Sequence, residues 1–306
     1  MKNHFTRALS YAKKTYRNYI YVTLCIILNK QLVHVILREN NKKFLWTNLQ
    51  VRNYLSASNL EYGKDSNVKL DPENDSIEFT FDKHRLMFYG ILENGFVYNE
   101  FLNFEYNDLN FKDKVVLDIG ANTGGTSVYF SLNGASQVYA VEPMPKTFSL
   151  LSKNLHVNNL LEKIVPINIG IGRNRNVILD PNVSGLGAQI PTSYKSQDSI
   201  SGEKIEIKSL KGLINEFNIV ECVLKMDCEG CEYSLLNEED DTLRKFKRIE
   251  LEFHYGYKNI EAKLVNAGFS TKIINIHKSH LSDPSLKSMA LKSNDYTIGI
   301  LFAELL

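Results

Sequence analysis

Residues 115–125, which read VVLDIGANTGG, constrain the fold of this chain more than any other segment. A buried strand runs into a glycine-rich turn, and the turn opens a helix. Residues 138–143, VYAVEP, then supply a second apolar strand that ends in an acid. A strand, a helix and a second strand at this spacing form a βαβ unit, which requires a parallel sheet. The segment therefore predicts an α/β fold with a ligand site where these strands end.

The composition of the turn indicates which ligand the site takes. Dinucleotide-binding folds use G-x-G-x-x-G, so that a pyrophosphate can lie at the helix N-terminus. Here Asp118 ends the strand and Asn122 stands between Gly120 and Gly124. A carboxylate at this position would repel a pyrophosphate, but it suits the sulfonium and amino groups of S-adenosylmethionine. The simpler alternative is that Asp118 caps the following helix and that the glycines only turn the chain.

The next strand end completes the expected cofactor site. Glu142 can accept hydrogen bonds from both ribose hydroxyls, as the corresponding acid does in dinucleotide folds. Pro143 follows it, and Gly170 comes just after the third strand. We expect both to line the cofactor.

From Lys114 onward strands and helices alternate, which predicts a Rossmann-like sheet of seven strands in a domain over residues 111–306. The predicted strands cover 115–118, 137–141, 164–169, 220–227, 248–254, 269–276 and 296–303. The predicted helices cover 125–133, 145–158, 210–217 and 260–267. The last two strands are expected to be antiparallel. An inserted hairpin region over 173–208, with Ser184–Gly187 as a turn, and a loop over 279–294 interrupt the pattern.

Residues 1–110 are predicted to form an N-terminal helix and a small β-rich cap. The helix should cover about 5–30, followed by a hairpin of 32–37 and 43–47, an irregular stretch over 58–76, strands at 76–81 and 86–92, and a short helix over 100–107. Residues 1–64 hold 11 Lys and Arg against two acids, a net charge of +9, and the rest of the chain carries −8. The apolar run Tyr19–Leu28 is too short to span a bilayer. A helix packed in the core is the default, and a helix on an anionic membrane surface is the alternative.

Polar residues at the later strand ends are candidates for catalysis. Lys225, Asp227 and Glu229 follow one another at the end of the fourth strand, and His254 ends the fifth. Asp227, Glu229 and His254 are candidate general bases, and Lys225 could orient an acceptor or lower its pKa. Each of them could equally be a structural polar group.

Cys228 and Cys231 form a C-x-x-C beside these candidates. No second C-x-x-C and no H-x-x-x-H nearby would complete a zinc site. Two reduced, buried thiols are favoured over a metal half-site or a redox pair, which agrees with a cytoplasmic location.

Four segments together resemble the FkbM family of S-adenosylmethionine-dependent methyltransferases. They read LDIGANTGG, VEP, LKMDCEGCEYSLL and IELEFH. The family signature on the fourth strand is roughly K-I-D-V-E-G-A-E, which this chain matches at Lys225, Asp227, Glu229, Gly230 and Glu232. The resemblance covers about residues 95–255. It implies a class I methyltransferase fold, S-adenosylmethionine as cofactor, and O-methylation of a hydroxyl on a sugar, a glycan or glycolipid, or another small metabolite.

Other readings stay open. The acceptor could be a protein, peptide or amine, or the chain could be a cofactor-binding scaffold without catalysis. Mg²⁺ held by Asp227 with Glu252 or His254 is an alternative, but nothing in the spacing demands it, so no metal ligand is assigned. A nucleic-acid substrate is disfavoured because the turn after the fourth strand is acidic and lacks the D/N-P-P-Y/F/W pattern. The glycine pattern disfavours a nicotinamide dehydrogenase, and the absence of G-x-x-x-x-G-K-[ST] excludes a P-loop kinase.

Overall fold

The computed structural model describes residues 2–61, 68–95, 97–102, 106–179, 194–195, 204–278 and 297–306. The chain divides into two compact units, Met1–Asn103 and Phe104–Leu306. The sequence places this boundary slightly later, between residues 110 and 111. Each unit is described below by itself.

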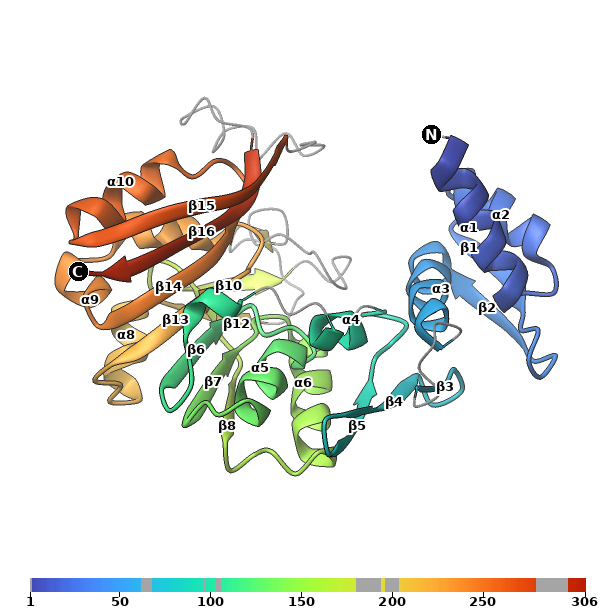
Figure 1. The fold of residues 1–306 in the computed structure, drawn as a ribbon, viewed down its shortest axis with the longest axis horizontal. Helices are drawn as coiled ribbons and strands as arrows, with labels where there is room; N and C mark the ends of the chain where they lie inside the picture. Colours follow the sequence, from blue (N-terminus) through green and yellow to red (C-terminus); the bar gives the residue numbers. More distant parts are fainter. Residues whose placement is uncertain are drawn as a thin grey trace. The chain divides into compact units, whose positions relative to one another are not determined.

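A seven-stranded sheet forms the centre of the second unit within the described residues (Figure 1). Its order is β15-β16-β14-β13-β6-β7-β8. The strands are β6 (Val115–Ile119), β7 (Gln137–Val141), β8 (Ile164–Ile167), β13 (Cys222–Met226), β14 (Phe246–Phe253), β15 (Phe269–Lys278) and β16 (Thr297–Leu305). Neighbours from β14 to β8 run parallel, whereas β16 is antiparallel to both β14 and β15. The predicted Rossmann-like sheet with its antiparallel final pair is confirmed.

Helices cover both faces of this sheet because alternate side chains of each strand point to opposite faces. Leu117 and Ile119 join a buried cluster that includes Leu210 and Leu213 of one helix and Leu264 of another. The opposite face packs against the helices that follow β6 and β7. The helical segments are η1 (Asn107–Leu109), α5 (Gly125–Leu132), α6 (Pro145–Val157), α8 (Leu210–Glu216), η2 (Cys231–Asn237), α9 (Asp240–Leu243) and α10 (Lys258–Asn266).

A smaller sheet lies in the region that the sequence assigns to an insertion. Among the described residues its order is β11-β10-β12-β9, with β9 (Gly170–Ile171), β10 (Arg175–Leu179), β11 (Tyr194–Lys195) and β12 (Lys204–Lys208). The expected third strand is shorter than predicted, because β8 ends at Ile167 and the chain pairs with β12 from Gly170 onward. The predicted Ser184–Gly187 turn and the 279–294 loop lie outside the described residues.

The first unit combines helices with a hairpin and a three-stranded sheet. Its elements are α1 (Lys2–Thr15), α2 (Tyr19–Ile27), β1 (Leu32–Ile36), β2 (Lys43–Thr47), α3 (Asn48–Glu61), β3 (Lys69–Asp71), β4 (Ser76–Phe81), β5 (His84–Tyr89) and α4 (Val97–Leu102). No described helix of the chain is both long and apolar enough to cross a membrane.

Three predictions for this unit are wrong. The single helix over 5–30 is two helices, because the chain between them bonds to β1: Arg17 N donates to Ile36 O, and the Asn18 side chain bonds to the backbone of His34 and Ile36. The stretch from residue 58 is not irregular at its start, since α3 extends to Glu61.

A capping signal at the start of α3 could have revealed that helix. Gln50 N donates to Thr47 Oγ1, and Thr47 N donates to Gln50 Oε1. This reciprocal pair is a capping box, which the sequence contains as T-x-x-Q. The short helix expected over 100–107 also lies earlier in the chain, as α4.

Candidate functional site

The glycine turn between β6 and α5 lies against the end of β13. Gly120 has φ +78°, and a Cβ added there would lie 1.8 Å from the carbonyl oxygen of Asp227. Asp227 N in turn donates to Ile119 O. Gly124 has φ +99°, and its Cβ would lie 2.8 Å from Leu151 Cδ1. Only glycine fits these two positions, so the turn holds the ends of β6 and β13 side by side.

Asp118 is completely buried at the end of β6, and its partners differ from those that the sequence suggests. Its Oδ1 lies 3.0 Å from Lys225 Nζ. Its Oδ2 accepts hydrogen bonds from Thr126 Oγ1 (2.7 Å) and Ser127 Oγ (2.6 Å) in the first turn of α5. The carboxylate is thus neutralised by a lysine and tied to the helix. A direct contact between Asp118 and a cationic ligand stays a prediction that this geometry does not favour.

Glu142 faces the glycine turn from the end of β7. Its Oε2 accepts from Asn122 N (3.1 Å) and its Oε1 from Met144 N (2.9 Å). Burial raises the pKa of Glu142 to about 7, although the two backbone donors act in the opposite direction. A carboxylate has about four acceptor positions, so two stay available for hydroxyl groups of a ligand.

The other predicted cofactor residues surround the same edge of the sheet. Asn122 has φ +51°, and its buried Oδ1 has no hydrogen-bond partner among the described residues. The Asn168 side chain, which the sequence does not single out, donates to the carbonyls of Glu142 and Pro143 and fixes that turn. Gly170 is buried in β9 beside Ile207 of β12, so its contact with a cofactor stays a prediction.

Lys225 is buried in β13, with 1% of the residue exposed. Its Nζ donates to Gly120 O (3.0 Å) in addition to pairing with Asp118. It also lies 5.4 Å from the ring centre of Tyr106, whose hydroxyl donates to Asp227 Oδ2 at 3.3 Å. These contacts make Lys225 a residue that positions the turn and Asp227. Its predicted contact with the acceptor finds no support in them.

The turn after β13 brings the next acids together. Glu229 (φ +56°) and Gly230 (φ +119°) reverse the chain before η2. The same reversal places the Cα atoms of Cys228 and Cys231 5.5 Å apart, and the two form a disulfide. The expectation of two reduced thiols is therefore wrong, because the tight turn brings the sulfur atoms within bonding reach.

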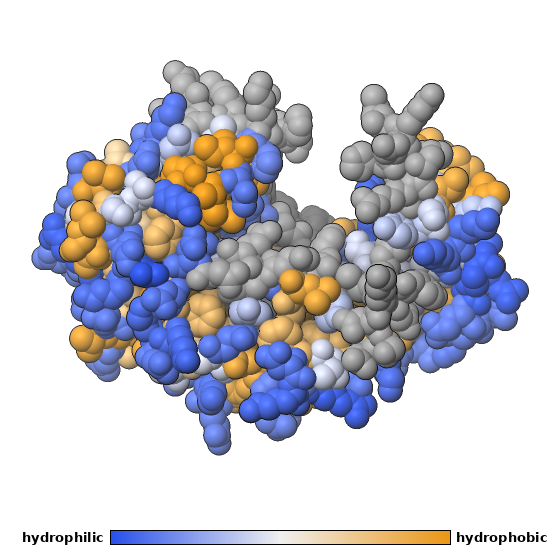
Figure 2. Space-filling view, in the orientation of Figure 1, coloured by the Kyte–Doolittle hydropathy of each residue, from blue (hydrophilic) through white to orange (hydrophobic). Residues whose placement is uncertain are grey.

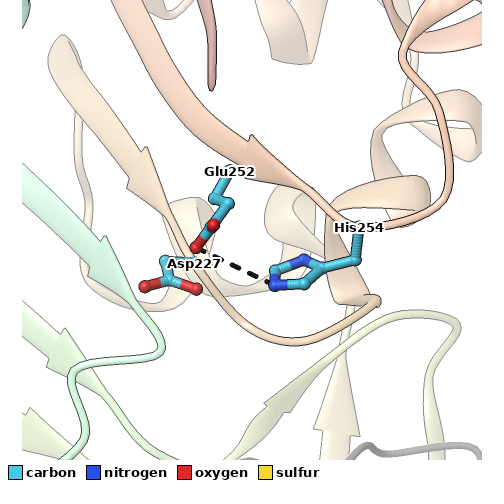
Figure 3. A group of neighbouring side chains, drawn as sticks. All are labelled: Asp227, Glu252 and His254. Carbon is cyan, nitrogen blue, oxygen red and sulfur yellow. Dashed lines mark ion pairs between the residues drawn. The ribbon is translucent and has the colours of Figure 1, made fainter. Parts of the chain in front are cut away.

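His254 lies at the end of β14 between two groups of carboxylates. Its Nδ1 lies 3.0 Å from Glu232 Oε1, and its Nε2 lies 3.5 Å from Glu229 Oε2 and 3.8 Å from Glu252 Oε2. Glu232 is fully buried and also accepts from the backbone N of Gly230 and of His254. Asp227, Glu252 and His254 point toward one another (Figure 3), and their ligand atoms lie within 4.8 Å of each other.

The pKa values of this cluster follow from burial and from the density of charge. Burial alone would lower the pKa of His254, but the hydrogen bond and charge of Glu232, with the charges of Glu229 and Asp227, raise it to about 10. Burial and repulsion from Asp227 raise the pKa of Glu252 to about 7. Near neutral pH the cluster thus holds an imidazolium and a carboxyl group that titrates.

Sequence reasoning gave Glu232 no role beyond its match to the fourth-strand signature, named Glu252 only as an alternative metal ligand, and missed Tyr106. Glu232 and Glu252 each had a signal, since the first is part of the fourth-strand signature and the second shares a strand face with His254. Tyr106 had none, because its contact with Asp227 joins residues 121 positions apart.

A family model and one known protein match this chain in sequence. A family model described as "Methyltransferase FkbM domain" matches residues 118–271, which include the glycine turn, Glu142, Asp227 and His254. The methyltransferase sdnD of Sordaria araneosa is 25% identical over 191 residues, which cover 51% of this chain and 74% of that protein.

Solved structures are also similar over part of the chain, among them the two that follow. The precorrin-6y C5,15-methyltransferase of Geobacter metallireducens is 15% identical with a TM-score of 0.36, over 65% of this chain and 83% of that one. TYW2 of M. jannaschii in complex with AdoMet is 13% identical with a TM-score of 0.38, over 78% and 90%.

Proposed function

The chain belongs to the FkbM methyltransferase family, and from that premise we propose that it transfers the methyl group of S-adenosylmethionine to a hydroxyl of a sugar, a glycan or glycolipid, or another small metabolite. One observation carries the proposal. Glu142 beside the glycine turn and the Asp227–His254 cluster lie at the same end of neighbouring parallel strands. In sheets of this kind ligands bind at the carboxyl ends of the strands.

Glu142 is the residue that best fits the methyl donor. It is 6% exposed, and among the described residues each of its oxygens has one backbone donor and one unused acceptor position. Two ribose hydroxyls would fill those positions and offset the cost of keeping the charge buried. The buried Oδ1 of Asn122 is a second acceptor at the same turn. These residues fit a nucleoside, whereas the buried and neutralised Asp118 would act only by holding the turn.

The carboxylates at the ends of β13 and β14 fit the acceptor. Bound S-adenosylmethionine would supply a methyl group on a positive sulfur. A carboxylate at these strand ends would accept the proton that the acceptor hydroxyl gives up as its oxygen takes the methyl group, and the electron pair of the broken carbon–sulfur bond would stay on the sulfur. Glu252, whose pKa is raised to about 7, and the neighbouring Asp227 are the proposed bases. When no metal ion is bound, His254 is protonated near neutral pH and would hold these acids in position.

The same charges disfavour a polyanionic acceptor. The side chains of Asp227, Glu229 and Glu252 surround a single imidazole, that of His254. These carboxylates would repel the phosphates of a nucleic acid. A peptide or amine acceptor, and a scaffold that binds the donor without turnover, are the rival functions.

We also propose that the first unit makes peripheral contact with anionic membranes. One face of α2 exposes Ile20, Tyr21, Leu24 and Ile27, and Leu28 follows it. Apolar side chains reach the surface over this unit in Figure 2. Exposed Lys13, Lys14, Arg17 and Lys30 lie close by in the sequence. An apolar stripe flanked by basic residues is typical of a helix that lies on a lipid surface.

Calorimetry with the full chain tests the donor. We expect S-adenosylmethionine to bind, NAD not to bind, and Glu142→Gln to weaken binding of S-adenosylmethionine. Binding of NAD in its place would overturn the proposal.

Transfer of a labelled methyl group tests the acceptor. Hydroxyl-bearing sugars and metabolites, peptides and amines are offered separately, and the product is examined by NMR. We expect methyl on oxygen. Methyl on nitrogen would support the amine or peptide alternative, and donor binding without any product would support the scaffold.

A further inference from the structure

We propose that Asp227, Glu252 and His254 bind one divalent cation of the first transition series at the ends of β13 and β14. The binding itself does not depend on the proposed methyl donor. A role of the ion toward the acceptor rests on the proposed function.

The positions of the three ligand atoms carry the first part of the argument. They come from two neighbouring strands and lie within 4.8 Å of one another (Figure 3). Ligand atoms about 2.1 Å from one ion in a tetrahedral site lie about 3.4 Å apart. The longest separation in the cluster therefore has to shorten by about 1.4 Å when an ion binds. The Glu252 side chain is 33% exposed and can make this adjustment.

The environment of His254 is an independent observation that points to a ligand. Glu232 is fully buried, and its Oε1 lies 3.0 Å from His254 Nδ1. The same oxygen accepts a hydrogen bond from the backbone N of His254. This leaves Nε2 directed at the carboxylates of Glu229 and Glu252. A carboxylate behind one ring nitrogen, with the other nitrogen facing oxygen ligands, is the usual outer-shell arrangement of a metal-bound histidine.

The chemistry of the ligands selects the ion. One imidazole and two carboxylates favour Mn²⁺, Fe²⁺, Co²⁺ or Zn²⁺ over Mg²⁺, which prefers oxygen and retained water. The neighbouring sulfurs of Cys228 and Cys231 are bonded to each other, so they do not add thiolate ligands. Three protein ligands leave coordination positions open, as in catalytic sites. Those positions can hold water or the oxygen of an acceptor.

The rival reading is a cluster held by protonated His254 without any metal. Titration of the full chain with Mn²⁺ separates the two, after dialysis against a chelator and with unbound Mn²⁺ followed by its EPR signal. We expect one bound Mn²⁺ per chain. Zn²⁺ should displace it, and an equal concentration of Mg²⁺ should not. No binding of Mn²⁺ by the wild-type chain would overturn the site, and equal displacement by Mg²⁺ would overturn the choice of ion.

Conservative variants locate the ion. Asp227→Asn and Glu252→Gln should abolish Mn²⁺ binding, and Glu232→Gln should weaken it about 10–100-fold by releasing the His254 ring. Glu162→Gln, an exposed acid in the turn before β8, is the matched control and should bind as the wild type does. Melting temperatures of all variants check folding. Wild-type affinity in folded Glu252→Gln would overturn the proposal.

The two proposals can fail separately, because the Mn²⁺ titration contains no methyl donor. A chain that binds Mn²⁺ but not S-adenosylmethionine would keep the metal site and reject the proposed function. A chain that binds S-adenosylmethionine but not Mn²⁺ would keep the proposed function and reject the metal site. His254 would then be a buried cation among the acids.

Discussion

At the scale of single residues, the ion pair between Asp118 and Lys225 changes the role of the glycine turn. Both residues match the motifs that point to the fold, and each was expected to face a ligand. They instead meet each other, with side chains that are 0% and 2% exposed. The acid and the lysine therefore hold the turn in place, and Glu142 is left as the acid that fits the cofactor.

Removing one member of this pair should unfold the site. Asp118→Asn and Lys225→Met should each lower the free energy of unfolding by about 3–5 kcal/mol, because the partner's buried charge loses the opposite charge that it faces. The double variant should lose less than the sum of the two losses. Urea denaturation measures all three. Lys211→Met, at the exposed pair with Glu239, is the control and should change little. If Lys225→Met were as mild as this control, the pair would not be structural.

The raised pKa of Glu142 predicts how donor binding depends on pH. Ribose hydroxyls stabilise the ionised carboxylate, so binding should expel its proton. Affinity for S-adenosylmethionine should then fall about tenfold per pH unit below the pKa of about 7 and level off above it. Calorimetry between about pH 5.5 and 8.5 tests this dependence. Glu142→Gln should remove it and Glu162→Gln should keep it. A flat wild-type profile would contradict the role of Glu142.

The same raised pKa has the opposite consequence for folding of the unliganded chain. The folded pKa of Glu142 lies above the ordinary value of 4.5. Its contribution to stability is therefore fully present below that value and is lost as the pH rises to about 7.

At the scale of elements, the glycine turn between β6 and α5 decides how closely the end of β6 can approach the end of β13. Gly120 and Gly134 both have positive φ, at +78° and +102°. They differ in what a Cβ would meet. At Gly120 it would meet the backbone of Asp227, and at Gly134 it would meet Lys112 Cγ at 3.2 Å.

This difference makes a matched pair of variants. Both Gly120→Ala and Gly134→Ala should lose roughly 1–2 kcal/mol from the left-handed backbone. Only Gly120→Ala should lose further stability and affinity for the donor, because the new Cβ would clash with the backbone of Asp227 and push the end of β13 away from the turn. Thermal melting and calorimetry compare them. Equal losses from both variants would show that the contact with Asp227 has no importance.

Helix α2 allows the membrane proposal to be tested on one element. Wild-type protein should co-sediment with anionic vesicles at low salt and less at high salt. Leu24→Glu should reduce binding by roughly 10–150-fold, because burial of a leucine contributes about 1.5–3 kcal/mol. Leu161→Glu in the second unit is the control, since Leu161 is 46% exposed and Leu24 is 52% exposed. Binding that is unchanged by Leu24→Glu would remove α2 from the contact.

At the scale of the whole molecule, the two units divide the proposed tasks. The glycine turn, Glu142, Tyr106 and the Asp227–His254 cluster all lie within Phe104–Leu306, and the apolar face of α2 lies within Met1–Asn103. The hydrophobic cluster of the second unit is built from its own strands and helices.

A chain of residues 104–306 should therefore fold and bind S-adenosylmethionine with nearly the affinity of the full chain. Circular dichroism and calorimetry would measure folding and binding. The full chain, tested in parallel, is the control. A truncated chain that folds but does not bind would mean that the donor site needs the first unit.

The sequence by itself determined the fold class and the strand ends that carry the candidate site residues. Apolar strands, glycine turns and the acids that follow them are local patterns, and a parallel sheet brings such ends to one edge. The bounds of β7 were predicted to the residue, and those of α5 to one residue. The same local reading named Glu142, Asp227 and His254.

Only the tertiary structure decided what those residues touch. The pairing of Asp118 with Lys225, the contact of Tyr106 with Asp227 and the buried Glu232 behind His254 each join residues far apart in the chain. Likewise, α1 and α2 are separate helices because the chain between them hydrogen-bonds to β1. The disulfide of the C-x-x-C forms because Glu229 and Gly230, both with positive φ, reverse the chain between the two cysteines. A local pattern fixes which way a side chain points along its own strand, but its partners and its charge depend on neighbouring strands that packing brings beside it.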